Sequence, residues 1–143
     1  MTSTRPFHMN DLFKFNNVNL DTLTETFNMS FYLTYMSRWP ELFTVAESPH
    51  SNNQASYYAN NVVTNPNYST TTNTNGGGSI MGYMIGKCEG RGRLWHGHVS
   101  AVTVAPLYRR LGLAKSLMDD LESTSNVVYN AYFVDLFVRA SNR

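Results

Sequence analysis

A short turn that carries two arginines and a glycine is the segment best suited to bind an anion. It follows the β-rich run 102–106 (VTVAP), and a helical pattern begins directly after it. Backbone N–H groups at a helix start, with charge-assisted donors from Arg109 and Arg110, can hold a phosphate. Gly112 permits close approach or an unusual backbone angle, and the small Ala114 leaves room for a ligand. The spacing matches neither the P-loop nor the dinucleotide fingerprint, and a plain basic turn before a solvated helix stays open.

Two histidines, one acid and one cysteine are the other side chains with chemical potential. His96 and His98 lie at i, i+2 and share a face of an extended strand, but the sequence offers them no evident third ligand, so we expect no metal. Asp135, in an apolar strand, is either a general base or, as we favour, a paired structural acid. Cys88 has no visible activating partner, which disfavours an acyl-carrying nucleophile.

The anion-binding turn resembles a known family signature. Residues 109–114 (RRLGLA) fit the R/Q-x-x-G-x-G/A pattern of the GNAT acetyltransferases, after a long strand that ends in VAP. Outside 48–79 the whole chain is similar to the catalytic subunits of NatB-type N-terminal acetyltransferases. The likeness is carried by 11–27 (DLFKFNNVNLDTLTETF), 31–35 (FYLTY), 39–40 (WP), 95–100 (WHGHVS), 133–139 (FVDLFVR) and 141–142 (SN).

The resemblance implies direct attack of a peptide α-amine on the thioester of acetyl-CoA, without a metal. It implies peptides that begin with Met followed by Asp, Glu, Asn or Gln. The catalytic candidates are His98 and the backbone of Val104, with no general base assigned. The implied coenzyme-binding residues are Val102, Thr103, Val104, Arg109, Arg110, Leu111, Gly112, Leu113, Ala114 and Asn142. The implied peptide-binding residues are Leu23, Glu25, Phe27, His98 and Ser100.

The same resemblance implies partners and a location. A large helical-repeat auxiliary subunit would dock the chain at the ribosome in the cytoplasm, with the aromatic-rich early helices as the docking face. The family continues past Asn142 with a tyrosine-bearing helix and two strands, so we expect a C-terminally incomplete domain. Two alternatives stay open: a non-catalytic short form that binds CoA and serves assembly, and a GNAT enzyme that acts on other amines.

Composition bounds these interpretations. The 143 residues, 42% hydrophobic and 15% charged, predict one globular domain, 1–143. The formal net charge of +1 creates no global field for nucleic acid or an anionic membrane. A single cysteine excludes an internal disulfide and favours a reducing, intracellular setting. No apolar run approaches the roughly 20 residues that cross a bilayer.

The elements that position the turn follow from periodicity and breakers. We expect an edge strand at 4–8, a helix capped by Asn10 or Asp11 that runs to 16, and an ordered loop at 17–28. The remaining expected elements are a helix at 30–39, strands at 42–47, 80–88 and 95–104, a helix at 113–123 and a strand at 131–139. In the strand at 80–88 we expect Met81, Tyr83 and Ile85 to share one face.

The segment 48–79, rich in Asn, Ser, Thr and Gly, is expected to be a flexible insertion in a hairpin loop. The final strand, apolar almost throughout, is expected to be central and covered on both faces. The fold class is therefore α/β (α+β), with a mixed central sheet of about five strands flanked by helices. By resemblance this is the GNAT acyltransferase fold.

Overall fold

The computed structural model describes residues 2–19, 24, 26–48, 78–138 and 140. Most of the expected insertion lies outside this part of the chain, as do the candidate site residues Leu23, Glu25 and Asn142. Among the described helices, none has the length and apolar character needed to cross a membrane.

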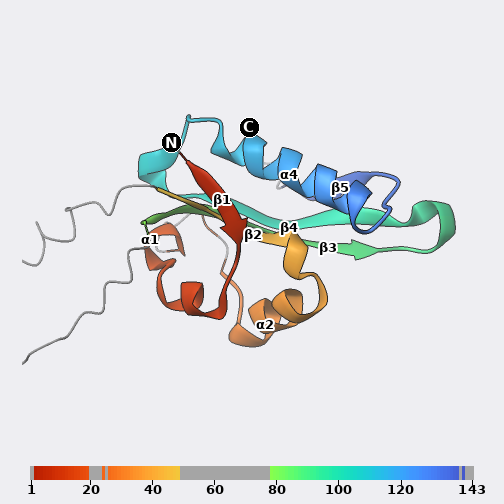
Figure 1. Ribbon diagram of the computed structural model, residues 1–143, viewed down its shortest axis with the longest axis horizontal. Helices are drawn as coiled ribbons and strands as arrows, with labels where there is room; N and C mark the ends of the chain where they lie inside the picture. Colours follow the sequence, from red (N-terminus) through yellow and green to blue (C-terminus); the bar gives the residue numbers. More distant parts are fainter. Residues whose placement is uncertain (1, 20–23, 25, 49–77, 139, 141–143) are drawn as a thin grey trace, which may run out of the picture.

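A five-stranded mixed sheet in sequential order organises the described chain (Figure 1). The strands are β1 (Ser3–Pro6), β2 (Phe43–Glu47), β3 (Ile80–Glu89), β4 (His96–Val104) and β5 (Val134–Leu136). The first four pair antiparallel, and β4 pairs with β5 in parallel. The expected mixed sheet of about five strands is confirmed, with β1 at one edge as predicted.

Helices cover both faces of this sheet. The α-helices are α1 (Asn16–Asn19), α2 (Met29–Arg38) and α4 (Leu113–Val127), and the short 3-10 turns are η1 (Met9–Phe13), η2 (Pro40–Leu42), η3 (Gly92–Leu94) and η4 (Pro106–Tyr108). Figure 1 shows α1 and α2 on one side of the sheet and α4 on the other. Each layer has its own apolar cluster against the sheet, and residues of β3 and β4 pack in both clusters.

The helix on the α4 face follows its amphipathic pattern. Leu113, Leu117 and Leu121 are buried at helical spacing against β3 and β4, and Met118 packs at the margin. The helix extends to Val127, four residues beyond the predicted end.

The beginning of the chain differs from the expectation of one capped α-helix. Residues Met9–Phe13 form a 3-10 turn, and α1 occupies part of the segment predicted to be a loop. Asp11 does not cap a helix from its first position: it is buried, accepts the His8 N–H, and receives two hydrogen bonds from Arg5 at 2.7 and 2.8 Å. The hydrogen bonds from the Arg5 guanidinium therefore hold this turn against β1.

Two β-bulges change which side chains share a face. Ala46 of β2 faces Gly82 of β3 and Glu47 faces Ile80, so Met81 is an extra residue without a partner in β2. Its side chain joins the α4-facing cluster, whereas Tyr83 and Ile85 join the other. The prediction that Met81 shares a face with them is therefore wrong, because a bulge interrupts the alternation of period two.

The last strand differs most from its prediction. It has three residues rather than nine, and within the described chain it forms the second edge of the sheet instead of a central position. Leu136 is 44% exposed, and Tyr132, Phe137 and Val138 are more exposed still. A continuous apolar run usually marks a strand covered on both faces. Here these side chains are largely exposed, and within the described chain β5 has no strand partner on its outer edge.

Candidate functional site

The outer half of β4 has an unpaired edge. β3 pairs with β4 as far as Val104, but β5 pairs only with Gly97, His98 and Val99. Residues 100–104 therefore have no strand neighbour on the β5 side within the described chain, and we call this stretch the open edge. Unpaired strand edges present backbone donors and acceptors to an extended ligand.

A second bulge lies where the pairing with β5 ends. Ile85 faces Ala101 and Gly86 faces Val99, which leaves Ser100 as the extra residue. A bulge bends a strand and increases its twist. The bulge at Ser100 thus turns β4 away from the line of β5 at the position where the open edge begins.

A hydrogen bond shows which backbone groups face outward at this edge. The Arg109 Nε–H donates to the Val104 carbonyl at 3.2 Å, so this carbonyl points away from β3. Because the N–H and C=O of one strand residue point the same way and alternate along the strand, the Val104 N–H and the backbone of Val102 face the open edge as well. The Thr103 backbone faces β3 instead.

The anion-binding turn, residues 109–114, follows directly and leads into α4. Arg110 and Gly112 both adopt positive φ, at 64° and 77°, and Gly112 is the N-cap of the helix. The Gly112 carbonyl accepts the Ser116 N–H, while Leu113 anchors the first turn in the core. The early N–H groups of a helix lack acceptors within the helix, so they are directed outward here as donors for an anion.

The predicted coenzyme residues of this turn lie together at one end of β4. Arg109, Arg110, Leu111, Gly112 and Ala114 are exposed, and Leu113 is buried. No atom lies within 4 Å of the position that a Gly112 Cβ would occupy. Gly112 is therefore required by its backbone angle and leaves a clear approach to the turn.

The predicted peptide-binding residues that the structure describes lie on the α2 face of the sheet. The Ser100 hydroxyl is 2.7 Å from the Tyr35 hydroxyl of α2. Tyr35 stacks on Phe31 at 4.4 Å between ring centroids, and Phe31 stacks on Phe27 at 4.1 Å. A continuous aromatic ladder thus joins Phe27 to Ser100 through Tyr35, a residue that was not among the predicted site residues.

A hollow of about 330 Å³ adjoins Phe27 at one end of this ladder. Its wall is formed by Leu12, Phe15, Asn19, Thr26, Phe27, Met29 and Tyr32. Except for the amide of Asn19 and the hydroxyls of Thr26 and Tyr32, these side chains are apolar, which suits an unbranched apolar side chain.

His98 is buried and held by an acid. Its Nδ1 lies 2.7 Å from Asp135 Oδ1 on β5, the strand that pairs with it in register. A carboxylate accepts the Nδ1–H, which leaves Nε2 for another partner. Asp135 is thus the paired acid that we favoured.

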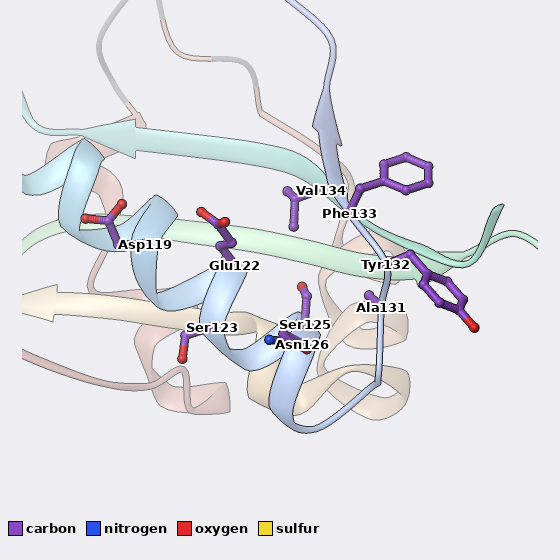
Figure 2. Close-up of a pocket in the computed structure, with 9 residues that line it drawn as sticks. All are labelled: Asp119, Glu122, Ser123, Ser125, Asn126, Ala131, Tyr132, Phe133 and Val134. Atoms are coloured by element: carbon purple, nitrogen blue, oxygen red, sulfur yellow. The ribbon is translucent and has the colours of Figure 1, made fainter. Parts of the chain in front are cut away.

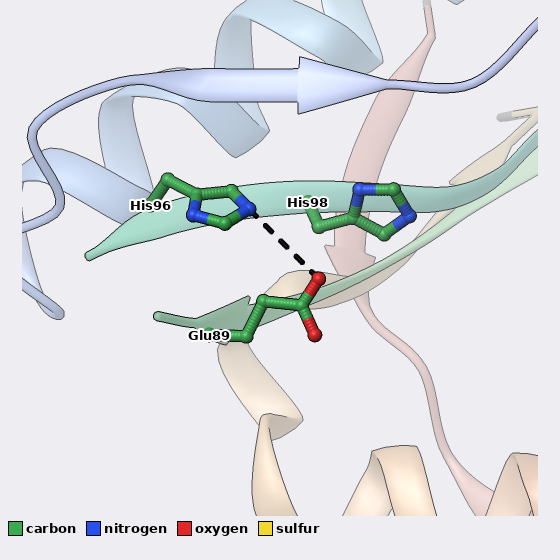
Figure 3. A group of neighbouring side chains, drawn as sticks. All are labelled: Glu89, His96 and His98. Carbon is green, nitrogen blue, oxygen red and sulfur yellow. Dashed lines mark ion pairs between the residues drawn. The ribbon is translucent and has the colours of Figure 1, made fainter. Parts of the chain in front are cut away.

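His96 lies on the same face, as predicted, beside Glu89 (Figure 3) and close to Asp135. Its Nε2 is 3.8 Å from Glu89 Oε1 and 3.5 Å from Asp135 Oδ2. Glu89 also pairs with Lys87 at 2.6 Å, and this hydrogen bond lowers the pKa of Glu89. Glu89 is a third donor beside the two histidines that sequence reasoning missed, because only the pairing of β3 with β4 brings it there.

Two other features lie away from this face. Burial in the α4-facing cluster raises the pKa of the Cys88 thiol despite a contact with Ser125, which keeps it protonated and unsuited to nucleophilic attack. A hollow of about 400 Å³ between α4 and the approach to β5 contains none of the predicted site residues (Figure 2). It is lined by Asp119, Glu122, Ser123, Ser125, Asn126, Ala131, Tyr132, Phe133 and Val134.

The open edge of β4 and the anion-binding turn at the start of α4 adjoin each other, and comparison with known families identifies the class of protein. The model of the acetyltransferase (GNAT) family matches residues 23–143. The chain belongs to this family.

Particular relatives narrow the resemblance. The chain is 52% identical to the N-terminal acetyltransferase B complex catalytic subunit NAA20 of Arabidopsis thaliana, over 99% of this chain and 66% of the relative. It is 51% identical to the corresponding subunit of Schizosaccharomyces pombe, over 99% of this chain and 64% of the relative. The chain therefore spans just under two thirds of the length of these relatives.

Solved structures give the same likeness. The NatB acetyltransferase complex bound to a bisubstrate inhibitor matches with a TM-score of 0.72 and 40% identity, over 98% of this chain and 64% of that one. Chaetomium thermophilum Naa20 in complex with a bisubstrate analogue matches with a TM-score of 0.72 and 36% identity, over the same shares. The expected GNAT fold is confirmed.

Proposed function

We propose that this chain is the catalytic subunit of a NatB-type complex, which transfers acetyl groups from acetyl-CoA to protein N-termini that begin Met-Asp, Met-Glu, Met-Asn or Met-Gln. The peptide α-amine attacks the thioester carbonyl, a C–N bond forms, and the C–S bond breaks. The amine loses a proton, and coenzyme A leaves as the thiol. The likeness to NatB catalytic subunits, at 52 and 51% identity, supports this assignment.

The observation that carries the proposal is the open edge of β4 beside the anion-binding turn. Outward-facing backbone groups at Val102 and Val104 can pair with the amides of a pantetheine arm, as a further strand would. The diphosphate then reaches the N–H groups at the start of α4, with Arg109 and Arg110 adjacent. The two features follow each other along the chain in the order in which a coenzyme A molecule presents them.

The backbone N–H of Val104 has a further role in this arrangement. It faces the open edge and could donate to the thioester oxygen of an arm bound there. A donor at the thioester oxygen stabilises the charge that develops during attack, and removing one such donor in other enzymes costs about 2.7–4 kcal/mol. The remainder of the acceleration comes from holding amine and thioester together.

The acceptor peptide would lie on the α2 face. The hollow beside Phe27 accommodates the first side chain, Met. His98, oriented by Asp135, and Ser100, held by Tyr35, are then available to the polar second side chain. With Nδ1–H donated to Asp135, only the imidazolium form of His98 also donates from Nε2. That donor can bind a carboxylate or an amide oxygen, which would account for acceptance of Asp, Glu, Asn and Gln together.

The proposal includes a partner and a location. A large helical-repeat auxiliary subunit would carry the chain to ribosomes in the cytoplasm, where nascent N-termini emerge. The buried aromatic residues of α2 belong to the core, so the docking surface would use the exposed apolar residues of η1 and α2 instead. These are Met9, Phe13, Met29 and Leu33.

Acetyl transfer by the assembled complex tests the proposal. We expect Met-Asp peptides to be acetylated and Ser-led peptides to be poor acceptors. His98→Asn should lower kcat/KM for Met-Asp peptides by about 10–150-fold, the equivalent of a hydrogen bond to a charged group worth about 1.5–3 kcal/mol. The exposed α4 variant Glu122→Gln is the matched control and should leave this value unchanged.

The outcomes separate the parts of the proposal. Absence of transfer to every peptide would contradict the catalytic assignment and favour a non-catalytic assembly role. Equal rates on Met-Asp and Ser-led peptides would leave an acetyltransferase but remove the NatB-type preference. Unchanged peptide choice in His98→Asn would place the recognition of the second residue elsewhere.

A further inference from the structure

The cluster of Glu89, His96 and His98 has a geometry that hydrogen bonding alone does not explain (Figure 3). One potential ligand atom from each residue lies within 4.8 Å of the other two. They come from the facing ends of β3 and β4, with Asp135 of β5 beside them. Two imidazoles and two carboxylates on one sheet face form the donor set that zinc and related divalent ions prefer.

The tautomer of His96 is already that of a metal ligand. Its Nδ1 lies 2.7 Å from the Leu94 carbonyl, which can only accept a hydrogen bond, so Nδ1 carries the proton. In the neutral ring, Nε2 then presents its lone pair to the two carboxylates. Ligating histidines in metal sites are oriented by such a bond from the other ring nitrogen to a backbone carbonyl or carboxylate. His98, bonded to Asp135, has a partner of the second kind.

The distances from His96 Nε2 to the two carboxylates are closer to those between ligands of one metal ion than to those of hydrogen bonds. His96 Nε2 is 3.5 Å from Asp135 Oδ2 and 3.8 Å from Glu89 Oε1, both much longer than the 2.7 Å bonds made by Nδ1 of each histidine. In a tetrahedral site with bonds of about 2.1 Å, neighbouring ligand atoms lie about 3.4 Å apart. A metal ion therefore fits between His96 and the carboxylates with small side-chain movements.

The two carboxylate oxygens of Glu89 have different neighbours. Oε2 binds Lys87 Nζ at 2.6 Å, and Oε1 faces His96. Glu89 thus stays ionised without using the oxygen that a metal would take. Lys87 also opposes a bound cation by charge repulsion, so the cluster as it stands is suited to reversible rather than permanent occupancy.

We propose that Glu89, His96 and His98 form a reversible site for a divalent transition metal ion, with Zn²⁺ as the best-suited ion. Its consequence for activity rests on the proposed function. An ion bound to His98 removes that imidazole from the second residue of the peptide, while the open edge and the anion-binding turn stay free. Zn²⁺ is therefore expected to inhibit acetyl transfer competitively against peptide and not against acetyl-CoA.

Direct binding of Co²⁺, a spectroscopic substitute for Zn²⁺, tests the site without reference to activity. The untagged protein in its complex is titrated with Co²⁺, and the visible absorption of a protein-bound ion with imidazole ligands is recorded. Glu89→Gln and His96→Asn should each weaken Co²⁺ binding by at least about 10-fold, since even orienting partners of metal ligands are worth 10–100-fold. Lys87→Gln, which removes the opposing charge, should strengthen it.

Matched controls separate ligation from general effects. Asp119→Asn removes an exposed carboxylate that pairs with Lys115 on α4, and it should leave Co²⁺ binding unchanged. Far-ultraviolet circular dichroism and a thermal melt check that each variant folds. Mg²⁺ prefers oxygen ligands in octahedral geometry, and it should not displace Co²⁺.

Different results would contradict the metal site and the proposed acetyl transfer. Absence of a Co²⁺ spectrum, or a spectrum that survives both His96→Asn and Glu89→Gln, would overturn the metal site while leaving acetyl transfer untouched. Zn²⁺ inhibition that competes with acetyl-CoA, or that persists in the two variants, would overturn its proposed consequence. A metal site without acetyl transfer to any peptide would instead contradict the proposed function.

Discussion

Replacement of Gly112 by alanine probes the anion-binding turn with the least disturbance elsewhere. Gly112 has a φ of 77°, and its missing Cβ would meet no atom within 4 Å. The whole effect in the free protein therefore comes from placing an L-residue in left-handed backbone, which costs about 1–2 kcal/mol.

This cost can appear in two measurements. If the introduced alanine keeps the left-handed angle, unfolding becomes easier by about 1 kcal/mol, a fall in Tm of roughly 3–6 °C. If the turn relaxes instead, coenzyme A must restore it on binding, and its Kd rises by about 5–30-fold for about 1–2 kcal/mol. We expect mainly the second result, because the turn is exposed and can relax.

Gly92→Ala is the matched control. Gly92 has a φ of 57°, its added Cβ would also meet nothing within 4 Å, and it lies in η3, far along the chain from the turn. Calorimetry with coenzyme A and a thermal melt compare the two variants in the complex. A Kd for coenzyme A that is unchanged in Gly112→Ala, or raised equally in both variants, would refute the assignment of the diphosphate to residues 109–114.

Three further substitutions test separate parts of the structure. Asp11→Asn should destabilise the fold by about 2–3 kcal/mol, since breaking a buried ion pair costs about 3–5 kcal/mol and Arg5 is partly exposed. Burial alone would raise the pKa of Asp11, but hydrogen bonds from Arg5 and the His8 N–H lower it overall. The contribution of Asp11 to stability is therefore present above the unfolded pKa of about 3.9 and is lost as the pH falls through the folded pKa. Thermal melts of Asp11→Asn in acid should show a weaker pH dependence over that interval than those of the unsubstituted protein. An equal pH dependence would contradict this interpretation. Gly97→Ala would place a Cβ 2.4 Å from Ser125 Oγ, and thermal melts should show a loss of about 1–3 kcal/mol, with no loss indicating that α4 packs less closely on β4. Tyr35→Phe removes the hydrogen bond to Ser100, and peptide KM should rise while the Kd of coenzyme A stays constant; a change in the Kd alone would assign Tyr35 to the coenzyme instead.

Periodicity and breakers were enough to predict most of the fold. The apolar periodicity of 113–123 predicted α4, and the glycine turn before Leu113 located the start of this helix. These features act within a few residues of one another. The resemblance to the GNAT family, carried by residues 109–114, supplied the topology that local patterns alone leave open.

Errors arose where a residue was added to a strand or where a neighbour was distant in sequence. Met81 and Ser100 are bulge residues, and nothing in their types distinguishes them from regular strand positions. Glu89 meets His96 only because β3 and β4 pair in a particular register. The apolar composition of residues 131–139 led us to expect a covered central strand. The composition of a strand does not show how many neighbours it has, so the edge position of β5 could not be predicted.

A structure of the complex with a bound bisubstrate analogue tests the central claim most directly. We predict that the diphosphate accepts hydrogen bonds from N–H groups within residues 111–114, and that the pantetheine pairs with the backbone of Val102 and Val104. A diphosphate held elsewhere, or a pantetheine arm that makes no contact with β4, would contradict the account.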